Sequence, residues 1–329
     1  MNNDRIQEIL DLMEEARLDY FLISDPQSIA YCTGYYNDPH ERMFVFMISK
    51  HGNHTLFMND LFYLEHDLDV NIVWHKDGQD AIQTIVDEMH FPGRIGIDKN
   101  WASHFLLDLM KKLPDAKYIN ASPCVDLVRM KKDLQEQVLM IESSKINDAV
   151  MEEIIPFIQE GVTEKQLAKK LDELFFNHHS TCYGAIVAFG KNAADPHHEN
   201  DDTPLRKGDC VLIDMGCVYK GYCSDMTRTF FYEGILEEEI KVYEIVKKAN
   251  EAAEAMIKPG VKLSDIDKCA RKVISDEGYG KYFTHRLGHF IGRDVHEYGD
   301  VSSVNEMEVE EGMIFSIEPG IYLEGNFGV

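Results

Sequence analysis

Two acidic residues, Asp214 and Asp225, stand beside apolar, strand-like runs. Residues 211–213 form an apolar run that ends in Asp214, and Asp225 leads into a second run. The pattern predicts a β-hairpin with its turn between Tyr219 and Lys220. In that register the two acids are direct cross-strand neighbours, with β-carbons roughly 4.5–5.5 Å apart. Carboxylates so close repel each other in a buried site unless one is protonated or a divalent cation lies between them. The alternative is an exposed hairpin with solvated acids, but the adjoining apolar runs favour burial.

Histidines occur near these acids in glycine-containing segments. His197 precedes the hairpin, and residues 285–297 contain His285, His289 and His296 together with Arg293. A lone histidine is more often a core or surface residue than a ligand. Several histidines in such segments, near strand-end acids, instead indicate a site.

The elements that must position these residues fall into two domains. Residues 1–123 alternate helix and strand patterns, which predicts a compact α/β domain. Residues 124–329 contain an internal repeat, because the strand that ends in Asp214 is echoed by one that ends in Glu318. A pseudo-twofold arrangement of two helix–helix–hairpin halves would bring both strand ends to one centre. Since the second return strand is cut at Val329, we expect a further acidic residue beyond that position.

Four motifs, in this order and spacing, resemble the dinuclear-metal peptidases of the pita-bread fold. They are I-D-M-G, S-D-M-T-R-T, G-H-x-x-G-x-x-V-H-E and S-I-E-P-G-I-Y. This superfamily includes methionine aminopeptidases, aminopeptidase P, Xaa-Pro dipeptidase (prolidase) and the metal-free creatinases. The resemblance is close over residues 125–329 and looser over the N-terminal domain, which is similar to the creatinase type. It implies an α+β protein with a C-terminal pita-bread domain.

The resemblance also implies the roles of individual residues. The implied metal ligands are Asp214, Asp225, His289 and Glu318, with a fifth glutamate past Val329. The resemblance also implies that the histidines His197 and His296 contact the substrate and act in catalysis. Glu318, as a ligand beside the nucleophile, is the predicted proton acceptor and the third catalytic residue. His285 and Arg293 complete the predicted substrate-binding residues. Two divalent ions would share a bridging hydroxide as nucleophile. Mostly oxygen ligands with one imidazole favour manganese, with cobalt or zinc as alternatives.

Arg293 is the main reason to expect a dipeptidase. A dipeptide carries its C-terminal carboxylate next to the scissile bond, and a guanidinium binds a carboxylate through two parallel hydrogen bonds. The alternative is a surface Arg293 paired with Asp294 or Glu297. The predicted function is therefore hydrolysis of Xaa-Pro dipeptides. Aminopeptidase P, acting on longer peptides, and a non-catalytic pita-bread binding module are the alternatives.

Composition limits the partners and the compartment. Lys and Arg number 33 against 58 Asp and Glu, a net charge of −25, which argues against nucleic acid and acidic membranes as partners. The N-terminal stretch lacks the features of a signal peptide, and no later stretch reaches membrane-spanning length. The seven cysteines contain no C-x-x-C pattern and are expected to be reduced. We expect a cytoplasmic protein that acts on small proline-containing peptides, and the resemblance implies a homodimer.

Overall fold

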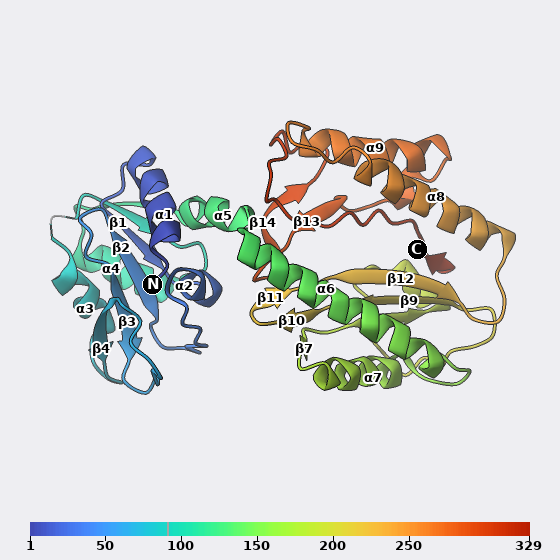
Figure 1. Ribbon diagram of the computed structural model, residues 1–329, viewed down its shortest axis with the longest axis horizontal. Coiled ribbons are helices and arrows are strands. Elements are labelled where there is room, and N and C mark those ends of the chain that lie inside the picture. Colours follow the sequence, from blue (N-terminus) through green and yellow to red (C-terminus); the bar gives the residue numbers. More distant parts are fainter. Residues whose placement is uncertain (91) are drawn as a thin grey trace. The chain divides into compact units, whose positions relative to one another are not determined.

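The computed structural model describes residues 1–90 and 92–329, which form two compact units, Met1–Arg129 and Met130–Val329 (Figure 1). The division falls later than the predicted boundary after residue 123, which lies inside helix α5 (Ser122–Met130). Cys124, Val125 and Val128 of this helix pack into the core of the first unit. The helix therefore belongs with the N-terminal core.

The first unit is a mixed sheet covered by helices on both faces, as expected of an α/β domain. The strand order is β4-β3-β2-β1-β5-β6, with β1 antiparallel to β2 and parallel to β5. Its elements are α1 (Asn3–Glu15), β1 (Tyr20–Ile23), α2 (Pro26–Thr33), β2 (Val45–Ser49), β3 (Thr55–Asn59), β4 (Asn71–His75), α3 (Ala81–Glu88), β5 (Arg94–Ile97), α4 (Ser103–Lys112), β6 (Lys117–Asn120) and α5.

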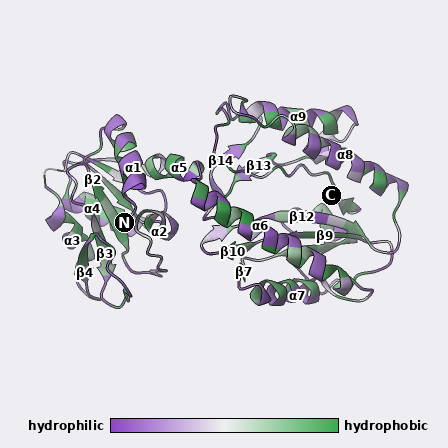
Figure 2. Cartoon of the chain, viewed as in Figure 1, coloured by the Kyte–Doolittle hydropathy of each residue, from purple (hydrophilic) through white to green (hydrophobic). Residues whose placement is uncertain are grey.

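Strand β1 shows why the sheet needs two helical layers. Phe21 and Ile23 face a core that α1, α2 and α5 complete, whereas Tyr20 and Leu22 face the core completed by α3 and α4. A strand buried on both faces reads as a continuous apolar run, because successive side chains point to opposite sides. In Figure 2 helix α1 carries both purple and green residues, as expected of a helix with one face on the core.

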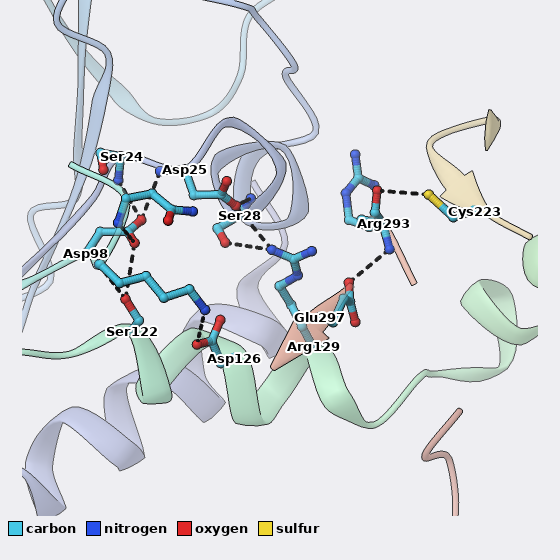
Figure 3. Close-up of polar contacts among 12 residues, drawn as sticks. Ser24, Asp25, Ser28, Asp98, Ser122, Asp126, Arg129, Cys223, Arg293 and Glu297 are labelled. Carbon is cyan, nitrogen blue, oxygen red and sulfur yellow. Dashed lines mark hydrogen bonds and ion pairs between the residues drawn. The ribbon is translucent and has the colours of Figure 1, made fainter. Parts of the chain in front are cut away.

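A buried carboxylate, Asp98, joins the ends of strands β1 and β5 in the first unit (Figure 3). Its oxygens accept hydrogen bonds from the main-chain N–H groups of Ser24 and Asp25, at 3.0 and 2.9 Å, and from the Ser122 hydroxyl at 3.1 Å. Each bond satisfies a polar group at a buried strand or helix end. Asp98 thus contributes to the framework of this unit.

The second unit places two groups of helices around small sheets and irregular strands. In Figure 1, α8 and α9 lie together on one side and α7 lies on the other, with β9, β12 and the C-terminal segment between them. Its elements are α6 (Leu134–Ile154), η1 (Ile155–Phe157), α7 (Glu164–Asn177), β7 (Thr181–Cys182), β8 (Ile186–Phe189), η2 (Gly190–Ala194), β9 (Cys210–Met215), β10 (Cys217–Tyr219), β11 (Tyr222–Cys223), β12 (Met226–Phe231), α8 (Glu237–Glu254), α9 (Leu263–Asp276), η3 (Gly280–Tyr282), β13 (Gly288–Phe290), β14 (Glu297–Val301), β15 (Tyr322–Leu323) and β16 (Phe327–Gly328).

The two halves of this unit repeat the same backbone hydrogen bonds, in agreement with the predicted internal repeat. In the first half, the N–H groups of Gly161 and Glu164 donate to the carbonyls of Leu205 and Thr203, at 2.9 and 3.3 Å. In the second half, the N–H groups of Gly260 and Leu263 donate to the carbonyls of Val309 and Met307, both at 2.9 Å. Each bond ties a helix start to the segment that leads into the strand-end acid. Asp214 and Glu318 are therefore delivered by equivalent scaffolds.

Two further sequence expectations concern thiols and membrane spans. The seven cysteines, all among the described residues, are free thiols. Within residues 1–90 and 92–329, no helix combines the length and the apolar character needed to cross a membrane.

Candidate metal centre

The hairpin that carries Asp214 and Asp225 forms, but in a different register from the predicted one. Thr227 lies opposite Asp214, and the turn residues are Lys220 and Gly221, with φ of +48° and +82°. Two consecutive left-handed residues make a tight turn that matches the strand twist, and glycine accepts the second position without strain. The turn is therefore centred one residue later than predicted. Continued along the hairpin, this register places Asp225 opposite a glycine, Gly216, rather than opposite Asp214.

Gly216, opposite Asp225, lies in a crowded part of the hairpin. A β-carbon at this position would lie 1.9 Å from the Tyr183 hydroxyl and 2.1 Å from the Ser224 carbonyl oxygen. The Tyr183 hydroxyl donates a hydrogen bond of 2.8 Å to that same carbonyl. Only glycine fits this crowded position, where β9 and β12 give way to β10 and β11. The break in the ladder is what leaves Asp225 free to reach the centre of the unit.

The second half supplies the other two predicted ligands from neighbouring segments. His289 lies on β13. Its main-chain N–H donates a hydrogen bond to the Ser316 hydroxyl oxygen at 2.9 Å. The N–H of Ser316 donates back to the His289 carbonyl at 2.8 Å, and that of Glu318 donates to Leu287 at 2.9 Å. A β-carbon at Gly288 would lie 1.9 Å from the Ser316 carbonyl oxygen. The close pairing that glycine permits brings Glu318 beside His289.

Three of the four predicted ligands form one cluster. His289 Nε2 lies 3.3 Å from Asp225 Oδ2 and 3.5 Å from Glu318 Oε1. One ligand atom from each of these residues lies within 4.8 Å of the others. Asp214 stands outside this trio but close enough for its charge to act on Glu318. The predicted fifth ligand, past Val329, is outside the described residues.

The hydrogen bonding of His289 leaves one ring nitrogen for the carboxylates. Its Nδ1 lies 3.2 Å from the Phe290 carbonyl oxygen, which only accepts hydrogen bonds, so Nδ1 carries a proton. Nε2 then faces Asp225 and Glu318. Burial lowers the pKa of His289, but the hydrogen bond to Asp225 and the charge of Glu318 outweigh it and raise the pKa. The cluster therefore favours a positive charge at Nε2, either a proton or a metal ion.

The carboxylates of the cluster are buried close to one another, which disfavours their charged forms. Burial and the charge of Asp225 raise the pKa of Asp214 to about 6, although the Thr227 hydroxyl donates to it at 2.9 Å. Burial, with the charges of Asp225 and Asp214, raises the pKa of Glu318 to about 7. Buried acids that repel one another are stabilised by a cation. Carboxylate oxygens with one oriented imidazole are a donor set that suits divalent ions.

The predicted histidines lie around this cluster. The rings of His296 and His289 have their centroids 4.1 Å apart in an edge-to-face arrangement. Burial lowers the pKa of His296, and the charges of His289 and Arg286 add to this effect. His285 contacts the Arg286 carbonyl through Nδ1 at 2.6 Å and the Tyr322 hydroxyl through Nε2 at 2.9 Å. A carbonyl accepts only, so Nδ1 is the donor and Nε2 accepts from Tyr322.

His197 is exposed on the segment that follows η2. Its main-chain N–H donates to Asp195 Oδ1 at 3.0 Å. Its charge contributes to lowering the pKa values of both His285 and His296, after the larger effect of burial. The structure thus brings His197 from the first half within electrostatic range of two histidines from the second half.

Arg293 lies at the tip of the hairpin. Its main-chain N–H donates to Glu297 at 2.9 Å, and its carbonyl oxygen accepts a 3.5 Å contact from the Cys223 thiol (Figure 3). Its guanidinium lies 5.4 Å from the ring centre of Tyr222. A β-carbon at Gly221 would be 3.2 Å from Arg293 Nη2. These contacts are those of a cation packed on a turn, and they do not include the carboxylate cluster.

Sequence reasoning missed three residues of this region. The exposed Arg286 acts electrostatically on both His285 and His296. Thr227 and Tyr322 hydrogen-bond to Asp214 and His285 respectively. Both stand inside the motifs used for the resemblance, and Arg286 directly follows a predicted site residue. Their proximity in sequence to the predicted site residues was the available signal. It did not reveal which of the neighbouring side chains contact the site or act on it.

Comparisons with known proteins agree with this geometry. Residues 138–329 match the model of metallopeptidase family M24, and residues 5–131 match the creatinase/prolidase N-terminal domain. An uncharacterized peptidase of Staphylococcus aureus is 34% identical over 334 residues, covering 99% of this chain and 93% of the relative.

Two solved structures are similar over almost the whole chain. A dipeptidase from Pyrococcus horikoshii OT3 is 36% identical, with a TM-score of 0.92 and coverage of 99% of this chain and 92% of that one. A prolidase from Thermococcus sibiricus is 33% identical, with a TM-score of 0.94 and coverage of 100% and 92%. These matches confirm the predicted α+β pita-bread fold with its creatinase-type N-terminal domain. The chain belongs to metallopeptidase family M24.

Proposed function

We propose that this metallopeptidase hydrolyses Xaa-Pro dipeptides and uses two divalent ions, with manganese as the first candidate. The observation that carries the proposal is His289 Nε2, which faces two carboxylates at 3.3 and 3.5 Å. Similarity to proteins described as a prolidase and a dipeptidase supports the substrate class. The free thiols support a reducing, cytoplasmic location, and the resemblance to prolidases supports a homodimer.

The residues present fit a pair of divalent ions. Asp214, Asp225, His289 and Glu318 would hold them, since buried mutual repulsion already favours cations there. When bound, the ions supply Lewis-acid activation of water and of the substrate carbonyl. The protein contributes the orientation of each ligand, through the Phe290 carbonyl at His289 and the Thr227 hydroxyl at Asp214.

The side chains around the cluster carry the remaining chemistry. The Glu318 carboxylate accepts the proton that water gives up and passes it on to the leaving amine. His296 and His197 donate hydrogen bonds to the oxygen on which negative charge develops, which is worth roughly 10²–10³ in rate for one well-placed donor. His285, whose two ring nitrogens are held by the Arg286 carbonyl and the Tyr322 hydroxyl, would contact the substrate through the face or edge of its ring.

A dipeptide also requires a cation for its C-terminal carboxylate. Arg293 is the residue predicted from sequence, but its guanidinium packs on the hairpin turn. Arg286 is exposed and its field reaches His285 and His296. We therefore favour Arg286 as the partner of the carboxylate, with Arg293 as the competing assignment.

The alternatives remain aminopeptidase P and a non-catalytic binding module. The buried, mutually repelling acids argue against the second, because a binding module gains nothing from them. Aminopeptidase P differs from a dipeptidase in the length of the peptide that it hydrolyses. The test measures free proline released from Xaa-Pro dipeptides against Xaa released from matched tripeptides, with manganese present. A strong preference for the dipeptides supports the proposal, and a preference for the tripeptides assigns the protein to the aminopeptidase class.

A further inference from the structure

A second carboxylate–imidazole cluster lies in the first half of the second unit. Glu164, His198 and Asp201 each offer a ligand atom within 4.8 Å of the others. Glu164 opens helix α7, its side chain is fully buried, and His198 directly follows the predicted catalytic residue His197. We propose that Glu164, acting through His198, is a positioning residue that holds the 195–201 segment so that His197 faces the reaction centre.

The oxygens of Glu164 tie three separate segments together. Oε1 accepts hydrogen bonds from the Phe189 N–H at 2.8 Å and from the Asn192 side chain at 2.9 Å. Oε2 contacts His198 Nε2 at 2.7 Å and accepts from the Asp201 N–H at 3.0 Å. Phe189 ends β8, Asn192 lies in η2, and the last two donors follow His197. One carboxylate therefore fixes the chain on both sides of His197.

These contacts also show that the cluster is built for hydrogen bonds rather than for a metal ion. Two carboxylate oxygens offer about four acceptor sites, and each site of Glu164 faces a donor of the protein. Because a carboxylate accepts and does not donate, His198 Nε2 carries the proton of its 2.7 Å contact. The imidazole therefore presents N–H, not a lone pair, to the cluster.

The link from His198 to His197 is short and stiff. The N–H of His197 donates to Asp195 Oδ1 at 3.0 Å, and the N–H of His198 donates to the Asp195 carbonyl at 3.1 Å. The chain at His197 is thus held by the turn at Asp195 before it and by Glu164 after it. Since the His197 side chain itself is exposed, its orientation depends on this main-chain support.

The second half supports its own histidine in a comparable way. Buried Asp267 of α9 pairs with Arg271 at 3.0 Å and accepts from the Leu287 N–H at 3.1 Å. Arg271 donates to the carbonyls of Phe283 and His285, at 3.0 and 2.9 Å. In both halves a buried acid on a helix, α7 or α9, holds a segment that carries a site histidine. This recurrence favours a positioning role for Glu164.

The proposal rests on the proposed peptidase function, so its test includes readouts with and without activity. His198→Leu and Glu164→Gln are compared with His198→Gln, whose amide can still donate to Glu164. The matched control is His178→Leu, which removes a surface imidazole that lies 2.9 Å from Glu153. We expect His198→Leu to lower kcat about tenfold, near 1.4 kcal/mol, with metal content unchanged. His198→Gln should recover most of the loss, and His178→Leu should have no effect.

A double-mutant cycle with His197→Ala separates positioning from general structural damage. If Glu164 and His198 act through His197, adding His198→Leu to His197→Ala costs no further activity. A further loss of the same size in that background would overturn the proposal, as would loss of bound metal in His198→Leu alone.

Hydrogen exchange provides a readout that needs no activity. In Glu164→Gln, the amides of Phe189 and Asp201 should exchange faster than in the wild type, and the control should leave them unchanged. If the wild type hydrolyses no peptide, the proposed function fails, and the exchange rates still decide whether Glu164 holds the segment. Unchanged protection of both amides in Glu164→Gln would overturn the claim.

Discussion

Two clusters in the second unit combine one imidazole with two carboxylates, and they differ in how their polar atoms are hydrogen-bonded. Asp225, His289 and Glu318 form the first, and Glu164, His198 and Asp201 form the second. In both clusters the ligand atoms lie within 4.8 Å of one another. In the second cluster, N–H groups of the protein point at Glu164, whereas in the first the acids and the imidazole nitrogen point at one another. Residue type and distance alone therefore do not define a metal site.

Both imidazoles face the acids through Nε2, and they differ in how completely those acids are already hydrogen-bonded by other donors of the protein. His198 presents a protonated Nε2 to Glu164 at 2.7 Å. His289 uses Nδ1 for the Phe290 carbonyl, so Nε2 is available to a cation. A metal-binding histidine commonly has its second nitrogen oriented by a carbonyl or carboxylate. His289 has this arrangement, and the comparison predicts that metal binds there and not at His198.

The largest expected effect comes from removing an acid of the metal centre. Asp225→Ala or Asp214→Ala should abolish hydrolysis and lower metal content, while the fold survives because repulsion between the acids is relieved. Peptidase assays, elemental analysis and far-UV circular dichroism check the three parts. The comparison breaks if either variant keeps full activity and its full complement of metal.

Metal addition should stabilise the protein through the first cluster alone. At a free manganese concentration of 100 Kd, binding to the native state contributes about 2.7 kcal/mol to the free energy of unfolding. Thermal unfolding of chelator-treated protein, with and without manganese, measures this effect. We expect the rise in Tm to persist in Glu164→Gln and to vanish in Asp225→Ala. A rise in Tm that vanishes in Glu164→Gln and persists in Asp225→Ala would instead place the metal at Glu164, His198 and Asp201.

The metal-free protein should lose stability as pH rises. The folded-state pKa values of Asp214 and Glu318 are raised to about 6 and about 7. An acid with a raised folded-state pKa stabilises the fold below its unfolded value near 4, and this contribution is lost as pH rises through the folded value. Urea unfolding after metal removal should show a loss on the order of 1–2 kcal/mol between pH 5 and 8. Asp214→Asn should reduce the slope, and an unchanged slope would contradict the electrostatic account.

The smallest effect distinguishes the two arginines. Arg286→Ala should raise KM for Xaa-Pro dipeptides about tenfold, near 1.4 kcal/mol, and change KM for dipeptide amides much less. Arg293→Ala serves as the matched variant, with a smaller effect on both substrates. If Arg293→Ala instead produces the selective rise, the assignment from sequence holds and the one favoured by the geometry is wrong.

Motifs and periodicity allowed much of this molecule to be predicted. The repeat follows from strand-end acids in equivalent positions, whereas the fold class and the grouping of Asp225, His289 and Glu318 were implied by the family resemblance. The hairpin register was missed because it depends on Lys220 adopting a left-handed conformation before Gly221. The conformation of Lys220 depends on the whole turn. The pattern of apolar residues alone therefore leaves the position of the turn uncertain by one residue.

Other features depended on contacts between residues far apart in sequence. Glu164 reads as an ordinary first-turn acid of a helix, and its role appears only when Phe189 and Asp201 are seen to donate to it. The first unit extends past the predicted boundary because apolar side chains of α5 pack into the N-terminal core. The placement of Arg293 against Gly221 likewise depends on a turn 72 residues earlier in the numbering.

One measurement tests the central claim most directly: anomalous X-ray diffraction from crystals soaked in manganese, collected at a wavelength where manganese scatters strongly. The account predicts anomalous density among Asp225, His289 and Glu318, next to Asp214, and no density at Glu164, His198 and Asp201. Density at the second cluster, or its absence from the first in crystals that contain bound manganese, would contradict the account.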